Sequence, residues 1–285
     1  MHNHKILVTG ATGTTGGEVV RQLMAAGQPA RALVRDVSKI DSDTFAGIEF
    51  VAGDLSDPAS LSAAMEDIRA VYLNVVPGPD ALMQVDNVIA AAKNAGVATI
   101  VKLSGYLASA ASPSAIIRMH SEADDHVRVS GLGYTILRAN SFYQNILGQM
   151  ESIKANGTFA LPLGNAHQSL IDVKDIAAIA IVAMTTDTLR NKSFDLTGPE
   201  SLTFADVAER LSRARGETVT YAPITRDQFE ATLRSYGTPD AAASDVGELF
   251  DAFASGIYAD VTDDVAKILG RQPRSFDAFA ANLFN

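Results

Sequence analysis

The stretch "KILVTGATGTTGG", residues 5–17, places a short apolar run directly before a cluster of glycines. Three of these glycines, Gly10, Gly13 and Gly16, follow the spacing G-x-x-G-x-x-G. Residues 17–27 then carry apolar side chains at helical spacing and end on a glycine. The stretch therefore predicts a strand, a glycine-rich turn and a helix, in that order.

The same alternation of strand and helix continues along the chain. Further short apolar runs that predict strands lie at 30–35, 48–53, 70–76, 97–104, 133–138 and 193–198. Strands that are apolar throughout and separated by helices are typical of a parallel sheet covered on both faces. We therefore predict an α/β protein with a doubly wound, Rossmann-like parallel sheet over residues 1–198, making an excursion toward a cleft at about 139–171. A smaller, mostly helical lobe on the substrate side is predicted over residues 199–285.

Composition excludes several classes of function. The chain has no cysteine, so disulfides, thiolate nucleophiles and cysteine-based metal sites are excluded. Its net charge of −10 argues against a nucleic-acid partner, which requires clustered Lys and Arg. No apolar run approaches the roughly 18–20 residues that cross a bilayer. We expect a cytoplasmic protein, monomeric or homodimeric, with no membrane or nucleic-acid partner.

The glycine spacing has a physical meaning at the start of a βαβ unit. A tight turn at Gly10 lets the chain leave the strand, and Gly13 lacks the Cβ that would block a pyrophosphate. Gly16 allows close packing of the helix, whose N-terminal N–H groups then face the phosphates. The stretch therefore predicts a dinucleotide-binding site.

The end of the second predicted strand should select the cofactor. An acidic residue there binds the ribose 2′-hydroxyl of NAD, whereas a basic residue accommodates the 2′-phosphate of NADP. The strand ends in "LVRD", and Arg35 suits a phosphate because its planar fork donates two hydrogen bonds. We predict that NADP is preferred and that NAD is possible. Asp36 leaves two alternatives, because it is placed either to pair with Arg35 or to meet a ribose hydroxyl.

The third predicted strand ends in "GDLSDP", residues 53–58. Two interpretations of Asp54 carry equal weight: its carboxylate approaches the adenine edge while Leu55 packs on the ring, or it only starts a turn.

Several segments together resemble the NmrA-like branch of the atypical short-chain dehydrogenases. The segments are "ILVTGATGTTGG", "ALVRD", "GDLSD", "GYTILRANSFYQN", "SFDLTGPESLTFADVAERLS" and "GIYADVTDDVAKILGRQPRSFDAFAANL". Within that branch the chain is similar to bacterial reductases of quinones, azo dyes and triphenylmethane dyes. The branch also contains redox-sensing regulators that bind the nucleotide without evident turnover.

This resemblance implies a set of cofactor-binding positions at strand ends. They are Gly10, Ala11, Thr12, Gly13, Thr14, Thr15, Gly16, Arg35, Asp54, Leu55, Leu73, Asn74, Val75, Ser104, Gly105, Arg138, Ala139, Asn140, Ser141, Phe142 and Tyr143. The last six would line the nicotinamide pocket, and Ser104, Gly105 and Tyr106 would lie near the nicotinamide.

One departure from ordinary short-chain dehydrogenases bears on the chemistry. Those enzymes use Tyr-x-x-x-Lys, in which the lysine lowers the tyrosine pKa, but Tyr106 is followed at that spacing by Ala110. A quinone or a cationic dye accepts hydride into a conjugated system and needs chiefly to be positioned. The missing lysine therefore favours a small aromatic or conjugated acceptor. A sensor that binds NADP(H) and acts through protein partners is the alternative.

The segment "MHSEADDH", residues 119–126, contains paired His and acidic residues one helical turn apart. It lacks the H-E-x-x-H arrangement, and no third ligand is evident, so we predict a charged helix surface and no metal site. His120 is a candidate proton donor beside Tyr106, because the resemblance places a cleft-facing residue near that position.

Overall fold

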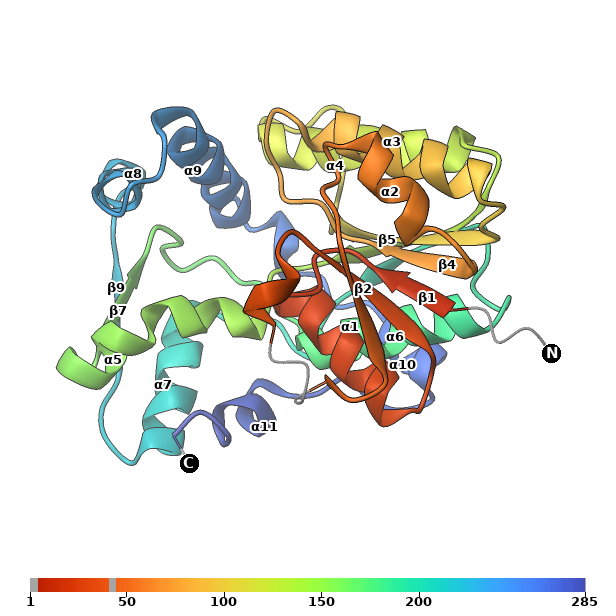
Figure 1. Ribbon diagram of the computed structural model, residues 1–285. Coiled ribbons are helices and arrows are strands. Elements are labelled where there is room, and N and C mark those ends of the chain that lie inside the picture. Colours follow the sequence, from red (N-terminus) through yellow and green to blue (C-terminus); the bar gives the residue numbers. More distant parts are fainter. Residues whose placement is uncertain (1–4, 41–44, 285) are drawn as a thin grey trace. The chain divides into compact units, whose positions relative to one another are not determined.

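A seven-stranded sheet organises the first part of the chain (Figure 1). The computed structural model describes residues 5–40 and 45–284. The strands of the sheet are β1 (Lys5–Val8), β2 (Ala30–Val34), β3 (Ile48–Ala52), β4 (Ile68–Leu73), β5 (Thr99–Gly105), β6 (Gly133–Ala139) and β8 (Lys192–Leu196). Their order is β3-β2-β1-β4-β5-β6-β8, and β1 pairs in parallel with both β2 and β4. The predicted doubly wound fold is confirmed.

Helices cover both faces of this sheet. They are α1 (Thr14–Ala25), α2 (Pro58–Ala64), α3 (Ala81–Asn94), α4 (Ala115–Val129) and α6 (Val173–Thr185). Helices α2, α3 and α4 lie over one face, and α1 and α6 lie over the other (Figure 1). This arrangement explains why Leu7 and Val8 on the central strand are fully buried, as the continuous apolar runs predict. None of the helices in the described ranges is long and apolar enough to cross a membrane.

The strand order reverses direction beside β1, where β2 lies on one side and β4 on the other. In open α/β sheets, ligands bind outside the carboxyl ends of the strands at such a switch point. The turn after β1, with its three glycines, therefore stands at the place where a ligand is expected.

Local sequence signals determine where several elements begin. The Asp57 carboxylate accepts a hydrogen bond from the Ala59 N–H at the start of α2, and Pro58 occupies the first helical position. At the start of α7 (Phe204–Arg215), Thr203 and Asp206 form a reciprocal capping box.

The chain forms two compact units that are interleaved along the sequence. The first contains residues 1–105, 119–138 and 176–194, and the second contains 106–118, 139–175 and 195–285. These units differ from a single division at 198/199. The predicted excursion at 139–171 packs in the second unit because its apolar side chains, including Phe159, share a core with the C-terminal helices.

The second unit contains a two-stranded parallel sheet and mostly short helices. In addition to α7, its elements are η3 (Tyr143–Gln149), α5 (Met150–Asn156), β7 (Thr158–Leu161), β9 (Thr220–Pro223), α8 (Arg226–Ser235), α9 (Asp240–Ala254), η4 (Ile257–Ala259), α10 (Asp264–Leu269) and α11 (Phe276–Ala280). Strands β7 and β9 pair in parallel, although the predominantly helical prediction after residue 199 did not include β9. Strand β9 forms beside β7 because Tyr221 on β9 packs against Phe159 on β7. This aromatic pair covers one apolar edge of the core.

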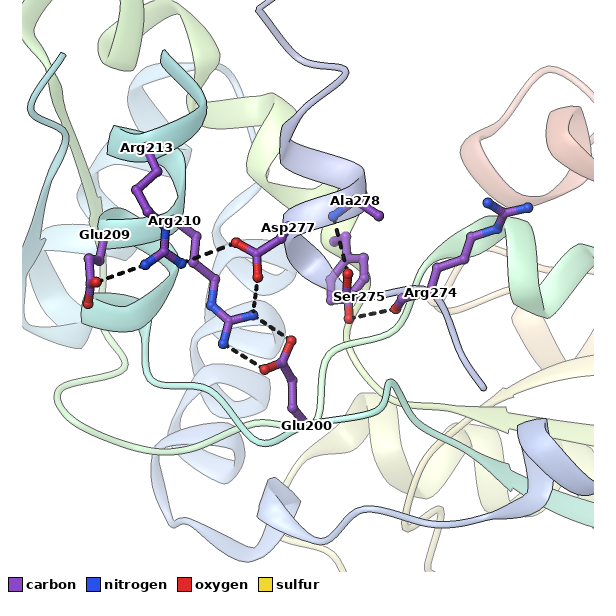
Figure 2. A network of polar contacts seen from close by, with 9 residues as sticks. Glu200, Glu209, Arg210, Arg213, Arg274, Ser275, Asp277 and Ala278 are labelled. Carbon is purple, nitrogen blue, oxygen red and sulfur yellow. Dashed lines mark hydrogen bonds and ion pairs between the residues drawn. The ribbon is translucent and has the colours of Figure 1, made fainter. Parts of the chain in front are cut away.

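Ion pairs connect the C-terminal helix to the rest of the second unit (Figure 2). Arg210 on α7 donates to both oxygens of Glu200, at 2.5 and 2.6 Å, and to Asp277 on α11 at 3.1 Å. Arg213, one turn further along α7, also donates to Asp277 at 3.2 Å. The network therefore fixes α11 against α7.

Candidate active site

The turn after β1 has a geometry that only glycine accommodates at two positions. Gly10 has a φ of +62°, in the left-handed region. A Cβ on Gly16 would lie 2.2 Å from the Gly10 carbonyl oxygen, which is far inside van der Waals contact. A Cβ on Gly13 would meet only that same oxygen, at 3.3 Å. Gly10 and Gly16 are therefore required by the fold, whereas the small size of Gly13 leaves space beside the turn.

Helix α1 begins without a side-chain cap. Its N-cap residue is Gly13, and no acidic residue lies in its first turn. The first N–H groups of a helix have no partner within the helix, and the helix dipole places partial positive charge there. The start of α1 therefore offers free donors to an anion, as in dinucleotide-binding folds.

Hydrogen bonds hold this turn against the end of β4. The Asn74 side-chain amide donates to the Thr15 hydroxyl at 3.0 Å, and the Asn74 N–H donates to the Thr9 hydroxyl at 2.9 Å. Thr9 in turn donates to the Tyr72 carbonyl at 3.1 Å. Asn74 and Thr15 thus position the glycine loop.

A cavity of about 560 Å³ lies beside the turn. Seven predicted residues line it, namely Gly10, Thr12, Gly13, Arg35, Asp54, Leu55 and Asn74. The sequence interpretation missed a further group, which comprises Leu33, Val34, Gly53, Ser56, Val76, Gly78, Pro79, Asp80, Ala81 and Gln84. The Gly and Pro residues of "VPGPD", residues 76–80, two positions beyond the end of β4, were the available signal for part of this group.

Arg35 lines this cavity with an exposed guanidinium. Within the described ranges it has no ion pair and no side-chain hydrogen bond. Asp36 does not pair with it, because the Asp36 carboxylate accepts from the Ser38 N–H and hydroxyl and lies 3.5 Å from Lys39. These bonds from Ser38 hold the pKa of Asp36 below its usual value. Asp36 therefore begins η1 (Val37–Lys39) and leaves Arg35 available to a ligand.

Asp54 combines features of both predicted interpretations. Its carboxylate accepts from the Ser56 N–H at 2.8 Å, which is a side-chain turn of the kind that aspartate forms. It is also exposed at the cavity wall next to Leu55. The turn is observed, and contact with an adenine is left as a proposal.

Other predicted residues of the first unit do not line the cavity. Ala11, Thr15, Gly16 and Leu73 are buried, whereas Thr14 is exposed and Val75 is half-buried. Leu73 packs in the sheet core, so its side chain is not a ligand contact. The buried residues among these reach a ligand only through their backbone or by supporting the loop, whereas the side chains of Thr14 and Val75 remain accessible.

The guanidinium of Arg138 belongs to an ion-pair cluster. The fully buried Asp124 of α4 accepts from Arg138 Nε at 3.1 Å and from Lys102 Nζ at 3.0 Å. Burial lowers the pKa of Lys102, and the Asp124 carboxylate opposes that effect. The bond to Asp124 makes Arg138 a support for β6 and α4, a role that sequence reasoning did not identify.

The environment of His120 disagrees with the predicted role of a charged proton donor. The side chain is half-buried, and its Nδ1 atom is buried with no hydrogen-bond partner among the described residues. Burial, together with the nearby Lys102 charge, lowers the pKa of His120 to about 3. The imidazole is therefore neutral at physiological pH, which removes it as a cationic acid.

Tyr106 lies in an aromatic cluster of the second unit. Its ring is 5% exposed and packs edge-on to Tyr258, with centroids 6.0 Å apart. Burial, with the charges of Asp195 and Asp260, raises the pKa of Tyr106. This effect is opposite to that of the lysine in ordinary short-chain dehydrogenases, so Tyr106 is not tuned for proton transfer at neutral pH.

Two residues after β6 have structural roles that differ from the predicted ligand contacts. Asn140 is 2% exposed, and its amide donates to the Ser169 hydroxyl and the Tyr258 carbonyl. Tyr143 is 1% exposed, packs against Phe276, and donates to the Arg274 carbonyl. Both side chains are occupied in the core of the second unit, which corrects the prediction that they line a nicotinamide pocket.

Other residues named for that pocket differ in exposure. Ser104 is buried on β5, and its hydroxyl has no hydrogen-bond partner within the described part of the chain. Gly105, Ser141 and Phe142 are half-buried, and Ala139 is buried. Among these, Ser104 is the one that offers an unused buried polar group.

The prediction that residues 119–126 form a charged helix surface is wrong for Asp124, which is fully buried. His126 lies 2.7 Å from Asp86, while Asp124 binds Lys102 as described above. Within residues 5–40 and 45–284 there is no group of three metal-ligating side chains.

Comparison with known proteins places these features in a family. A model of the NmrA-like family matches residues 2–280. The NAD(P)H azoreductase of Xenophilus azovorans is 38% identical over 275 residues, which cover 96% of each chain.

Two solved structures are also similar. The NADPH complex of the NADPH-dependent quinone oxidoreductase of Escherichia coli has a TM-score of 0.86 at 28% identity, over 98% of this chain and 100% of that one. The NADP(H) complex of Citrobacter sp. triphenylmethane reductase has a TM-score of 0.84 at 25% identity, over 99% and 100% of the two chains. With the glycine turn, the sheet order and the match over nearly its whole length, the chain belongs to the NmrA-like family.

Proposed function

We propose that the protein is an NAD(P)H-dependent oxidoreductase that transfers hydride to a small conjugated acceptor such as a quinone, an azo dye or a triphenylmethane dye. The observation that carries the proposal is the cavity beside the glycine turn, with a helix terminus that no side chain caps and an arginine that has no ion pair among the described residues. Relatives named as an azoreductase, a quinone oxidoreductase and a triphenylmethane reductase support the reaction class.

The residues beside the turn fit a dinucleotide. We assign the first N–H groups of α1 to the pyrophosphate and Arg35 to the 2′-phosphate, so that NADPH is preferred and NADH is tolerated. Asp54 and Leu55 are assigned to the adenine end of the cavity. When bound, NADPH supplies the hydride. We further assign the strand ends at Leu73–Val75 and Ser104–Gly105, together with Ala139, Ser141 and Phe142, to the ribose and nicotinamide side of the cofactor.

We infer the class of acceptor from the two candidate proton donors, Tyr106 and His120, neither of which is tuned to donate a proton at neutral pH. Tyr106 has a raised pKa, and the lowered pKa of His120 leaves its imidazole neutral at physiological pH. A conjugated acceptor takes hydride without simultaneous protonation, and water supplies a proton afterwards where one is needed. The chain's contribution is then to orient the acceptor and exclude water from it.

Arg35 should discriminate between the two cofactors. Arg35→Ala should weaken NADPH binding about 100-fold, because a charge-assisted bidentate hydrogen bond contributes roughly 2–3 kcal/mol. NADH binding should change by less than about twofold, because NADH has no 2′-phosphate. Titration calorimetry with each cofactor measures both affinities. Lys39→Ala removes a nearby exposed charge that does not line the cavity and serves as the control. Equal losses for both cofactors would contradict the assignment.

Tyr106 should act through its ring and not through its hydroxyl. Tyr106→Phe keeps the contact with Tyr258, so quinone reduction should stay within about tenfold of the parent, a barrier change near 1.4 kcal/mol. Tyr106→Ala or Phe142→Ala should cost more, by loosening the position of the acceptor. Steady-state kinetics with a neutral quinone tests this. A loss of several orders of magnitude in Tyr106→Phe would show that the hydroxyl is an acid and would favour a carbonyl substrate.

The proposed function itself is tested by following absorbance at the nicotinamide band while quinones and dyes are added to the protein with NADPH or NADH. Acceptor-dependent oxidation of NADPH is the expected result. Tight binding of NADP(H) with no turnover of any acceptor, and a marked preference for one redox state, would instead favour the sensor function.

A further inference from the structure

Two walls of the cavity beside the glycine turn are joined by a side-chain hydrogen bond. One wall is the turn after β3, residues 53–56, and the other is the start of α3. Gln84, in the first turn of α3, donates from its side-chain amide to the Ser56 hydroxyl at 2.9 Å. Both residues belong to the first unit and line the cavity, so this bond bridges the two walls.

A second amide on the same helix holds the same turn. Asn87 donates from its side-chain amide to the Leu55 carbonyl oxygen at 2.9 Å. Residues three positions apart lie on one face of a helix, so Gln84 and Asn87 present two amides to two consecutive residues of the turn. Both are half-buried, whereas Ser56 is exposed. One face of α3 therefore holds the turn by its backbone and by a side chain.

Other hydrogen bonds shape the turn without reaching α3. The Asp54 carboxylate accepts from the Ser56 N–H, and the Asp54 N–H donates to the hydroxyl of Ser60 on α2 at 3.0 Å. These bonds set the conformation of the turn and its contact with α2. The width of the cavity between the turn and α3 depends instead on the bonds from Gln84 and Asn87.

We infer that Gln84 and Asn87 are positioning residues for the cofactor, which hold the turn after β3 in its binding arrangement before the cofactor enters. This role rests on the proposed function, because that function assigns Asp54 and Leu55 of the turn to the adenine. A wall that is fixed in advance lowers the ordering cost of binding. Gln84 and Asn87 therefore act on cofactor affinity through the turn, and they take no part in the transfer of hydride.

Loss of the bridge should weaken binding of the adenylate half of the cofactor by itself. Without the bond, the turn occupies its binding arrangement for only part of the time, and the apparent affinity falls by that fraction. Gln84→Ala should weaken binding of adenosine 2′,5′-bisphosphate about fivefold, which is the effect of one neutral hydrogen bond. Titration calorimetry measures this affinity. In turnover with NADPH and a quinone, the KM for NADPH should rise by the same factor while kcat is unaltered, because only cofactor binding has changed.

Two variants of equal shape at the exposed Ser56 test the same bond from the side of the turn. Ser56→Thr keeps a hydroxyl for Gln84, whereas Ser56→Val replaces that hydroxyl with a methyl group. The valine variant should bind the bisphosphate about fivefold more weakly than the threonine variant. Combining Ser56→Val with Gln84→Ala should add no more than about twofold to the loss, because both changes remove one and the same bond.

Asn87→Ala breaks a different bond and should cause a further loss of about fivefold when it is combined with Gln84→Ala. Asn94→Ala is the matched control, because Asn94 is exposed at the end of the same helix and does not line the cavity. It should leave binding of the bisphosphate unchanged. Thermal unfolding followed by circular dichroism shows whether each variant is folded.

The outcomes distinguish the positioning role from the proposed function. Equal affinities in Ser56→Thr and Ser56→Val, or an unchanged affinity in Gln84→Ala, overturn the positioning role whatever happens to stability. Fully multiplied losses in the combined Ser56→Val and Gln84→Ala variant also overturn it, because the two side chains would then contact the ligand separately. A parent protein that does not bind the bisphosphate overturns both the positioning role and the cofactor assignment. Binding that depends on the bridge, with no acceptor-dependent oxidation of NADPH, supports the positioning role and overturns the reductase function alone.

Discussion

Replacing Gly13 with valine should abolish detectable binding of both NADPH and NADH while leaving the protein folded. Gly13 has extended backbone angles that valine can adopt, and a Cβ there meets only the Gly10 carbonyl oxygen, at 3.3 Å. The added methyl groups occupy the approach to the first turn of α1. Losing several charge-assisted hydrogen bonds there should weaken both cofactors by at least about 1,000-fold, or roughly 4 kcal/mol.

Calorimetry with both cofactors measures this loss, and circular dichroism follows unfolding in a chain without tryptophan. Gly148→Val is a matched control, because Gly148 lies outside the cavity with open space around its Cα. It should leave binding unchanged. Gly16→Ala should instead destabilise the fold, because its Cβ would overlap the Gly10 carbonyl. Retained cofactor binding in Gly13→Val would place the pyrophosphate elsewhere.

Replacing the buried Asp175 with alanine should destabilise the protein much more than replacing the exposed Asp277. Asp175 is fully buried, and its oxygens accept from Arg271 Nη2 at 2.6 Å and from the Arg274 N–H at 2.7 Å. These bonds hold the segment that leads into α11. The free energy of unfolding should fall by about 2–3 kcal/mol, because two hydrogen bonds to a buried charged group are lost.

Asp277→Ala provides the control. Asp277 also contacts two arginines, in the network of Figure 2, but its side chain is 54% exposed. Exposed ion pairs contribute about 0–1 kcal/mol, so this variant should unfold within about 1 kcal/mol of the parent. Denaturant titrations of both variants, followed by circular dichroism, give the comparison. Equal destabilisation by the two substitutions would show that burial does not determine the contribution of these carboxylates.

The sequence determined the fold and the location of the cavity beside the glycine turn. Apolar runs at strand spacing and the three glycines are local signals, and the glycine requirements at residues 10 and 16 follow from backbone geometry within a few residues. The same is true of the capping box at Thr203, whose partners lie three residues apart. Arg35 could be named because it directly follows a strand whose end is a fixed place in this fold.

Tertiary structure alone decided which side chains are buried and paired and which stay accessible. Asn140 and Tyr143 follow β6 in a segment that resembles a binding loop, but their partners, Tyr258 and Arg274, are more than 100 residues away. The low pKa of His120 depends on burial beside Lys102, which lies on another element 18 positions earlier in the chain. Local sequence determines backbone conformation because the steric contacts and caps that set backbone angles act between residues a few positions apart. Burial, charge and the direction of a side chain depend on contacts that only the folded chain brings together.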